Sequence, residues 1–366
     1  MIIPGTYITV LDEGLISVGA VSVGNVGVVG TATLVEEEAE EGTTPGDAAK
    51  RVYTLSSFTE ARELFKPPTP KETLLKTLEL LFGNGARTVY VAVAADDSIE
   101  AYKSGLALLE NEPVNIVLLA GQDASRAGVG EALREHIKAT ETIERERIGV
   151  IGSSATADVA VLLKEADATR DDHGRILFVG PGIRLVRRDP IKGEEVEEQL
   201  SGAYTAAAVA GLISSLPPHI SPTNKTLVVG GLGARFNHGQ LEKLVANNVL
   251  VIERREGYRV VRGVTTSSNA AWRQVTTRRI VDKALFGTRS ACNPYIGKLN
   301  NPRVRGAMKA TLDGFLTSMI DEESLRAYRL DVSATRQQEI AGKCVVTMSL
   351  QPTFCIDYVV VTMYLG

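Results

Sequence analysis

Hydrophobic and polar positions divide the chain into two regions with different periodicity. From Arg87 to about residue 195, short apolar runs such as "VYVAV" and "ILFVG" alternate with amphipathic segments of helical period. Apolar runs flanked by helices are typical of a parallel sheet that is covered on both faces. The predicted strands cover residues 87–93, 114–120, 147–152 and 175–180, and the predicted helices cover residues 98–110, 126–143 and 154–168.

The segments before this unit mix strand and helix signals. Residues 5–11 predict a short strand, because Thr6, Ile8 and Val10 alternate with Tyr7, Thr9 and Leu11. The run 26–35 predicts a buried strand that leads into the acidic segment "EEEAEEGTTPGD", which we expect to be an exposed loop. One helix is expected after an N-cap at Ser56 or Ser57, and another from Pro70 to Gly83.

After about residue 195 the pattern indicates an α+β region with antiparallel strands. Residues 194–217 predict one long Ala-rich helix that ends at Pro217-Pro218. Residues 249–266 predict a hairpin that turns at Glu256-Gly257. Amphipathic helices are expected over residues 269–287 and 301–320, and further strands over residues 227–233, 325–333, 342–353 and 355–365.

The last of these strands, "CIDYVVVTMYL", is apolar on both faces. Ile356, Tyr358, Val360, Thr362 and Tyr364 share one face, and the opposite face carries mainly Val, Met and Leu. Unpaired strand edges recruit other chains, so we expect this segment to pair with a neighbouring subunit. The alternative is a central strand of the chain's own domain.

Composition and charge narrow the class of protein. The 366 residues are 44% apolar and 23% charged, as in a globular protein of two or three domains. Residues 1–200 carry a formal charge of −13 and residues 201–366 carry +9. The basic half is compatible with binding to nucleic acid or to an acidic protein surface. No run predicts a membrane span, and the N-terminus lacks the features of a signal peptide.

A search for catalytic and metal-binding motifs finds little. His136, His173, His219 and His238 are scattered, and "DDHG" at 171–174 favours a turn over a metal site. The basic segment "TTRRIVDK" predicts a solvated or subunit-facing helix face, with phosphate binding as the alternative. The loop "VVGGLGARF" fits a dinucleotide fingerprint poorly, yet a nucleotide-dependent two-domain α/β enzyme using Gly230–Gly233 remains the alternative function. We therefore predict no catalytic residue, metal or cofactor.

Four segments, in order along the chain, resemble contractile tail sheath proteins of phages and phage-tail-like particles. They are "PGTYITV" followed by "VGNVGVVGTA", "AAAVAGLISSLPPHISPTNKTL", "LVANNVLVIERREGYRVVRGVTT" and "WRQVTTRRIVDKAL". The resemblance implies a non-enzymatic virion or phage-tail-like structural subunit, made in the bacterial cytoplasm. It implies stacked six-membered rings around an inner tail tube protein, contact with baseplate and tail terminator proteins, no nucleic acid and no membrane insertion. The sheath would contract to drive the tube through an envelope.

The resemblance also implies a domain plan. Residues 1–20 would be an N-terminal arm and first strand, residues 21–198 an outer α/β insertion, residues 199–354 a tube-proximal α+β core, and residues 355–366 a C-terminal arm. The arms would add strands to neighbouring subunits. The arm residues are Tyr7, Ile8, Thr9, Val10, Ile356, Tyr358, Val360, Thr362 and Tyr364.

The helix predicted over residues 301–320 is the candidate for binding the tube. Leu312, Phe315, Leu316 and Met319 form an apolar stripe that would pack inward. Arg305 and Lys309 share another face, with Arg303 near them in the first turn, and all three would meet an acidic tube surface. A solvated basic face is the alternative.

Overall fold

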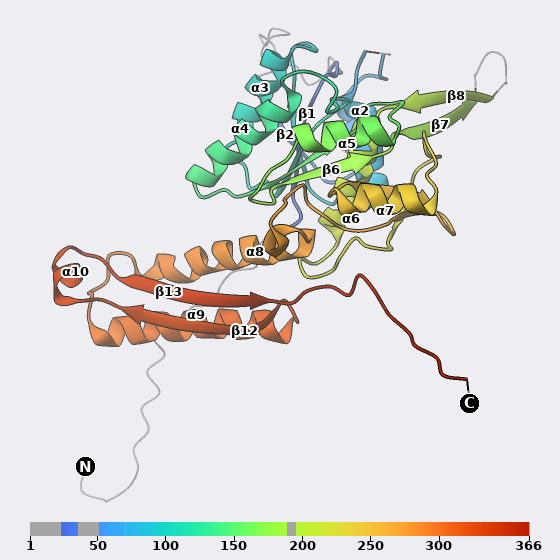
Figure 1. Cartoon of the computed structure of the whole chain (residues 1–366). Helices are drawn as coiled ribbons and strands as arrows, with labels where there is room; N and C mark the ends of the chain where they lie inside the picture. The colour runs from blue at the N-terminus through green and yellow to red at the C-terminus, as the bar shows by residue number, and fades with distance from the viewer. Residues whose placement is uncertain (1–22, 36–50, 70, 189–194, 366) are drawn as a thin grey trace, which may run out of the picture. The chain divides into compact units, whose positions relative to one another are not determined.

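The computed structural model describes residues 23–35, 51–69, 71–188 and 195–365, and every structural statement below concerns these residues. They fall into two compact units (Figure 1). The larger unit comprises Ser22–Asp282 and Thr353–Gly366, and the smaller unit contributes Lys283–Pro352 to the described part. The predicted strand at residues 5–11 and the acidic segment at 36–47 lie outside the described residues.

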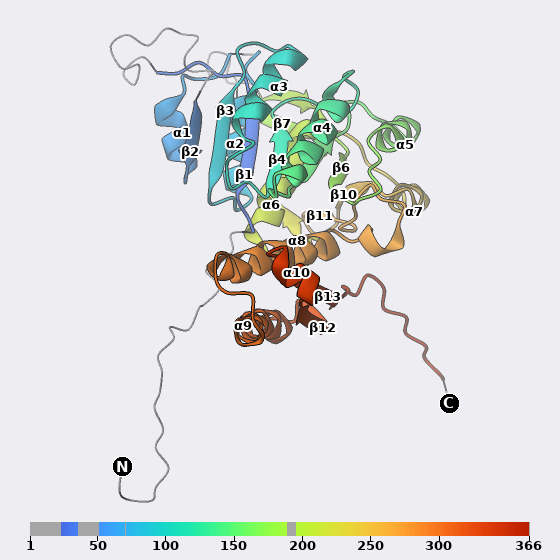
Figure 2. The same cartoon turned by 90° about the vertical axis from the view of Figure 1, so that its left-hand side faces the viewer.

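The larger unit is built on a nine-stranded sheet in the order β2-β3-β1-β4-β5-β6-β10-β11-β9 (Figure 2). The six central strands run parallel, whereas β2 at one edge and β11 and β9 at the other run antiparallel to their neighbours. The strands are β1 (Val26–Gly30), β2 (Val52–Leu55), β3 (Val89–Val93), β4 (Ile116–Leu119), β5 (Ile148–Gly152), β6 (Ile176–Gly180), β9 (Thr226–Leu227), β10 (Leu250–Arg254) and β11 (Tyr258–Val260).

Helices cover both faces of this sheet, as the apolar runs predict. Successive strand residues point to opposite faces, so Val28 joins one hydrophobic cluster and Val29 the other. The first cluster includes side chains of α1 (Phe58–Leu64), α2 (Leu74–Gly83) and α6 (Gly202–Ser215). The second includes side chains of α3 (Ile99–Leu108), α4 (Val129–Thr142), α5 (Val159–Ala168) and α7 (His238–Ala246).

Small residues allow α6 to lie directly against the sheet. Residues 202–213 of α6 are all buried, and most of them are Ala or Gly. A Cβ atom added at Gly152 of β5 would lie 1.9 Å from the carbonyl carbon of Gly202, so only glycine fits at this contact. The Ala-rich composition of this segment therefore reflects close helix–sheet packing.

The structure corrects the predicted helix over residues 194–217. Its first part is strand β8 (Glu195–Leu200), which pairs antiparallel with β7 (Ile183–Arg188), and Ser201 caps α6 through a hydrogen bond to Ala203. Strand pairing overrides the helix propensity of the glutamates. Two smaller corrections concern residues 227–233, where only Thr226–Leu227 forms a strand, and α2, which begins at Leu74 rather than near Pro70.

The domain boundary expected at residue 198 is also wrong. Helix α6 packs on the nine-stranded sheet and β10 pairs with β6, so residues 199–282 belong to the larger unit. The boundary instead falls between Asp282 and Lys283, inside α8 (Val275–Cys292). The sequence missed this because β10 and β11 form a hairpin, a pattern that predicts an antiparallel sheet, while β10 joins the parallel sheet by its other edge.

The smaller unit combines helices with a two-stranded sheet. Helix α9 (Pro302–Asp321) buries the four residues of its predicted stripe, Leu312, Phe315, Leu316 and Met319. A Cβ atom at Gly287 of α8 would lie 1.9 Å from the Phe315 ring, so this glycine makes room for the phenylalanine. Strands β12 (Leu325–Ser333) and β13 (Val345–Pro352) pair antiparallel, and α10 (Arg336–Ile340) lies between them in the chain.

Most other predicted elements are confirmed, including the four strands and three helices between residues 87 and 180 and the N-cap at Ser57. Glu256 and Gly257 have φ angles of 49° and 101°, as expected for the tight turn between β10 and β11. The predicted last strand is not formed: residues 355–365 are not assigned to any strand. None of the described helices is long and apolar enough to cross a membrane.

Candidate assembly surfaces

The C-terminal segment is attached to the larger unit at residues 355–358. Arg262, which follows β11, donates to Asp357 Oδ2 at 2.8 Å and 2.9 Å through Nη2 and Nε, and its guanidinium lies 5.3 Å from the centre of the Tyr358 ring. Gln274 donates to Asp357 Oδ2 at 3.0 Å and accepts from the backbone N–H of Cys355 at 3.1 Å. Because only 8% of the Asp357 side chain is exposed, these contacts form a defined root.

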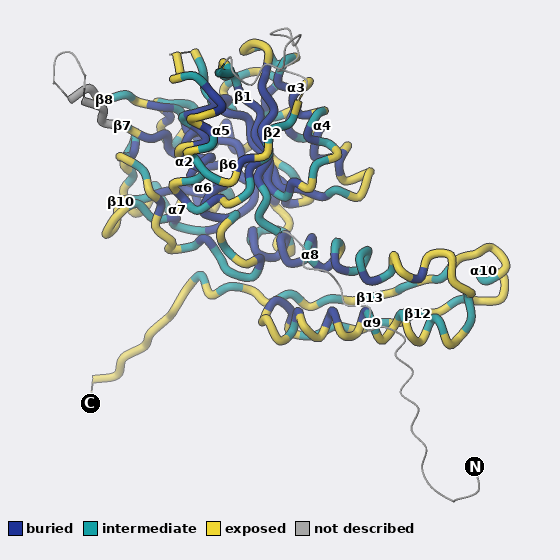
Figure 3. The backbone as a smooth tube through the Cα atoms, turned by 180° about the vertical axis from the view of Figure 1, so that it is seen from behind, coloured by how far each residue is buried: buried dark blue, intermediate teal, exposed yellow. Residues whose placement is uncertain are grey.

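Beyond this root the segment is exposed. Val359, Val360, Tyr364 and Leu365 are 79%, 90%, 92% and 101% exposed, and Figure 3 shows the segment in the colour of exposed residues. A run of large apolar side chains in water is unfavourable by roughly 25 cal/mol per Å² of apolar surface. The free chain therefore presents a surface patch that another molecule can cover.

The two-stranded sheet of β12 and β13 offers a second surface to which another chain could bind. Exposed and half-buried residues alternate along β13, as in a sheet covered on one face. In the described part of the chain this sheet contains no third strand. A two-stranded sheet is only marginally stable by itself, and both of its outer edges can accept further strands.

The three cations expected to face a tube do not share one environment. Arg303 and Lys309 are exposed on α9. Arg305 instead donates to Glu339 Oε1 of α10 and to Asn300 Oδ1, both at 2.9 Å, and only 13% of its side chain is exposed. Hydrogen bonds from Arg336 and, to a smaller extent, from Arg305 lower the pKa of Glu339. Arg305 therefore holds α10 to α9, and this role was not visible in the sequence.

The basic segment "TTRRIVDK" is buried, which contradicts both the solvated face and the phosphate-binding alternative. Arg278 donates to Asp282 Oδ1 at 2.7 Å and lies 4.3 Å from the centre of the Trp272 ring. Arg175, the residue before β6, donates to Asp282 Oδ2 at 3.1 Å. Burial lowers the pKa of Arg278, and the attraction of Asp282 opposes that shift. This charge cluster joins the start of α8 to β6.

Arg279 has a different set of partners. It donates to the backbone carbonyls of Leu216, Pro217 and Val23 at 2.8, 3.3 and 3.2 Å. Burial lowers its pKa to about 10, so it stays charged at neutral pH. The guanidinium satisfies carbonyls that follow the C-terminus of α6, and it is therefore a structural residue.

The alternative nucleotide site lacks the required topology. The loop Gly230–Gly233 follows β9, a two-residue edge strand that pairs antiparallel with β11. Dinucleotide loops connect a parallel strand to a helix whose N-terminus meets the phosphates, and here α7 begins only at His238. At 171–174 the expected turn is present, with a hydrogen bond from Gly174 N to Asp171 O. The described residues contain no group of three His, Cys, Asp or Glu able to hold a metal.

Comparisons with solved structures identify the fold. The contracted helical sheath of the anti-feeding prophage aligns over 99% of both chains with a TM-score of 0.77 and 17% identity. The contracted sheath of the extracellular contractile injection system PVC covers 99% of this chain and 97% of its own, with a TM-score of 0.73 and 16% identity. A sheath tail protein from Listeria innocua covers 91% of this chain and 92% of its own, with a TM-score of 0.63 and 12% identity.

Comparisons at the sequence level give the family. A search of curated proteins finds no match. The family model of the phage tail sheath protein central domain matches residues 97–266, and the model of the phage tail sheath C-terminal domain matches residues 267–366. The two models meet within the chain and together cover well over half of it. The chain therefore belongs to the contractile tail sheath family.

Proposed function

We propose that this protein is the structural subunit of a contractile sheath, in which copies form stacked six-membered rings around an inner tube. The observation that carries the proposal is the exposed apolar segment after Tyr358, because a free chain gains nothing from presenting it. Family membership and the resemblance to two contracted sheaths support the same function. The role is mechanical rather than enzymatic.

In this proposal residues 359–365 of one copy add a strand to the open edge of the β12–β13 sheet in a neighbour. The hydrogen-bonding groups of the segment's backbone would be satisfied by the ladder, and one apolar face would be covered. Each backbone hydrogen bond contributes about 0.5–1.5 kcal/mol, so a short ladder holds subunits together by several kcal/mol. Residues 5–11, with Tyr7, Ile8, Thr9 and Val10, are proposed as the second arm.

The root at residues 355–358 gives such an arm a fixed origin on its own subunit. A joint of this kind keeps copies connected while the subunits rearrange as rigid bodies. Contraction would then release energy through new contacts between subunits and drive the tube through an envelope. Baseplate and terminator proteins are the expected partners at the two ends of the particle.

Contact with the tube is proposed for Arg303 and Lys309 of α9. Both residues are exposed, whereas only 13% of the Arg305 side chain is exposed. Replacing Arg303 and Lys309 together with Glu should prevent assembly on the tube and leave tubeless assembly intact. Individually the contacts are weak and screened by salt, so the double replacement is needed.

Negative-stain microscopy of the purified protein tests the function. We expect tubes or stacked rings of uniform diameter at high protein concentration. A chain that remains a small discrete oligomer at every concentration, with bound nucleotide, would support the alternative enzyme instead.

A further inference from the structure

Two free thiols, Cys292 and Cys344, lie at the ends of two neighbouring elements of the smaller unit. Cys292 is the last residue of α8, and Cys344 directly precedes β13. Both side chains are half-buried, so a small reagent in solution can reach them. The proposed function uses neither residue.

Two contacts between these elements bracket the thiols. Thr288 Oγ1 of α8 lies 3.9 Å from Met348 Sδ of β13. Further along the chain, Asn300 Nδ2 donates to the carbonyl oxygen of Lys343 at 2.8 Å. As the chain advances from Thr288 to Asn300, its partner therefore moves back from Met348 to Lys343. Each thiol lies within one of the two intervals that these contacts delimit, so the fold brings the thiols close together.

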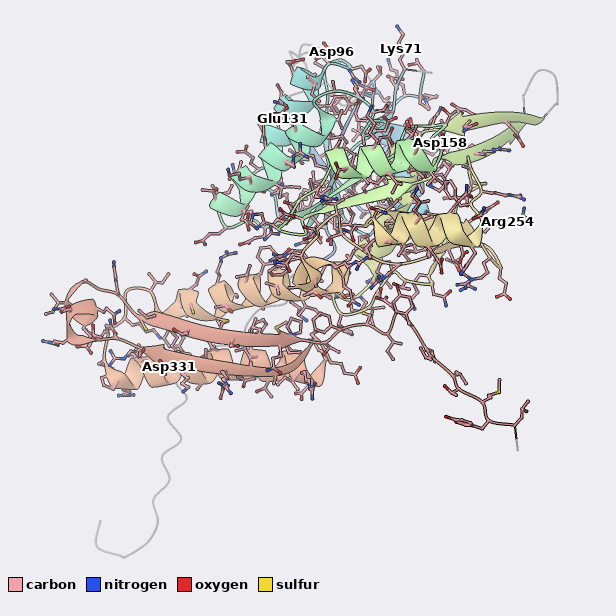
Figure 4. The ribbon with its side chains drawn as sticks, viewed as in Figure 1. Lys71, Asp96, Glu131, Asp158, Arg254 and Asp331 are labelled. Carbon is pink, nitrogen blue, oxygen red and sulfur yellow. The ribbon has the colours of Figure 1, made fainter. Side chains whose placement is uncertain are left out.

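The thiols also lie on the faces that form the first of these contacts. Cys292 follows Thr288 by one helical turn, and residues four apart share a face of a helix. In the β12–β13 sheet, Asp331, which is labelled in Figure 4, pairs with Thr347, and both are exposed. The alternate residues of β13 are half-buried, and Cys344 continues that series just before the strand.

The electrostatics of the two sulfurs support the same placement. Burial raises the pKa of Cys292, and a charge on Cys344 raises it further. Such an effect requires the two thiols to be neighbours, because the repulsion between like charges falls with distance. The third thiol has other partners: Cys355 Sγ lies 3.6 Å from the carbonyl oxygen of His219 and 3.5 Å from Thr276 Oγ1.

We propose that Cys292 and Cys344 form a reversible disulfide when the protein meets a disulfide oxidant such as oxidised glutathione. One thiolate attacks a sulfur of the oxidant and expels a glutathione thiolate, which leaves a mixed disulfide on the protein. The second thiolate attacks the protein sulfur of that mixed disulfide and expels the second glutathione thiolate. Two protein thiols are thus oxidised, one oxidant is reduced, and the two thiol protons end on the two glutathione molecules.

The new bond would close a loop that contains α9, β12 and α10. It would join the start of β13 to the end of α8, so the β12–β13 sheet could no longer separate from that helix without reduction. A cross-link of this kind also restricts the unfolded chain, and its effect grows with the length of the closed loop. The disulfide is therefore a redox-controlled lock on the smaller unit, and it does not depend on sheath assembly.

Oxidation of the full-length protein with oxidised glutathione, followed by alkylation and peptide mapping, tests the proposal. We expect a cross-linked peptide pair that contains Cys292 and Cys344. Cys355→Ser should form the same cross-link, because Cys355 takes no part in it. Cys292→Ser should form no cross-link and should instead carry glutathione at Cys344.

Pairing in the urea-unfolded chain is the matched control. There, loop closure favours the two thiols that are closer in sequence, Cys344 and Cys355. A change of partner for Cys344, from Cys355 in urea to Cys292 in the native protein, would show that the fold selects the pair.

Hydrogen exchange reports the lock itself. We expect the β13 amides of the oxidised wild type to exchange about tenfold more slowly than those of the reduced protein, because opening of this strand is suppressed. Dithiothreitol should abolish the difference, and Cys292→Ser should not show it. Mixed disulfides without a cross-link, a cross-link between two copies, or the same pairing in native and unfolded protein would overturn the proposed disulfide. A Cys292–Cys344 cross-link that leaves exchange unchanged would overturn the lock.

Discussion

The two units of this chain differ in how fully their sheets are covered and extended by other elements of the same chain. The larger unit covers both faces of a nine-stranded sheet and places antiparallel strands at the two margins. The smaller unit has a sheet of only two strands in its described part, and the exposed apolar run at residues 359–365 is rooted on the larger unit but is not covered by it. A chain that leaves sheet edges unpaired and an apolar segment uncovered is suited to assembly, because neighbouring copies can pair with those edges and cover that segment.

The largest loss in the free energy of unfolding of the larger unit is expected when Asp282 is replaced. Replacing it with Asn keeps the shape but leaves Arg278 with a buried, uncompensated charge and leaves Arg175 with Glu141 as its one carboxylate partner among the described residues. Breaking a buried pair in this way costs about 3–5 kcal/mol. Chemical denaturation should therefore show a large loss in the free energy of unfolding. Asp167→Asn is the control, because its pair with Arg170 is exposed and should contribute less than about 1 kcal/mol. Equal losses in the two variants would contradict this account of the cluster.

A smaller effect is expected at the root of the arm. Arg262→Ala removes the partner of Asp357, whose side chain is mostly buried, and should lower the free energy of unfolding by about 1–3 kcal/mol. It should also speed proteolysis after Tyr358, since the root would detach. Arg254→Ala is the matched control, because Arg254 has no side-chain partner among the described residues. Unchanged proteolysis in Arg262→Ala would show that the root is held by other contacts.

The smallest effect near neutral pH is expected at His136 in the larger unit, where the first half pH unit below 6.5 should lower the free energy of unfolding by at most about 0.7 kcal/mol. Burial and the nearby Arg147, at 3.0 Å, lower the pKa of His136 to about 3. The unfolded chain binds this proton near pH 6.5, so stability should fall as the pH drops from about 6.5 toward 3, by up to about 1.4 kcal/mol per pH unit. His136→Gln should make the dependence shallower by that amount. Identical pH profiles would contradict the assigned pKa.

The sequence predicted best where local chemistry decides the structure. Ser57 caps α1, and the apolar stripe of α9 is buried as its helical spacing requires. Prediction from the sequence failed where contacts between residues far apart in the chain determine the structure. The pairing of Arg262 with Asp357 joins two non-repetitive segments, and neither carries a periodic signal. Arg279 looked like part of a solvent-facing charge cluster because its partners, the carbonyls of Val23, Leu216 and Pro217, lie far away in the sequence.

The C-terminal run shows a further limit of the sequence. Its alternation predicted a strand, but a strand needs a partner, and the described chain forms none at residues 355–365. The same physical reason explains why the tube-facing residues and the arms at 5–11 remain predictions. Contacts supplied by other subunits leave a pattern in the sequence without fixing where the partner lies.

The most direct test of the account is removal of residues 359–366, which leaves the root at Asp357 and Tyr358 in place. We predict a folded monomer whose melting temperature matches that of the full-length chain, because the deleted side chains are exposed. Under conditions in which the full-length protein forms sedimentable tubes, the truncated protein should stay in the supernatant. Tubes formed by the truncated chain, or loss of its cooperative unfolding transition, would contradict the claim that this segment serves assembly and not the fold.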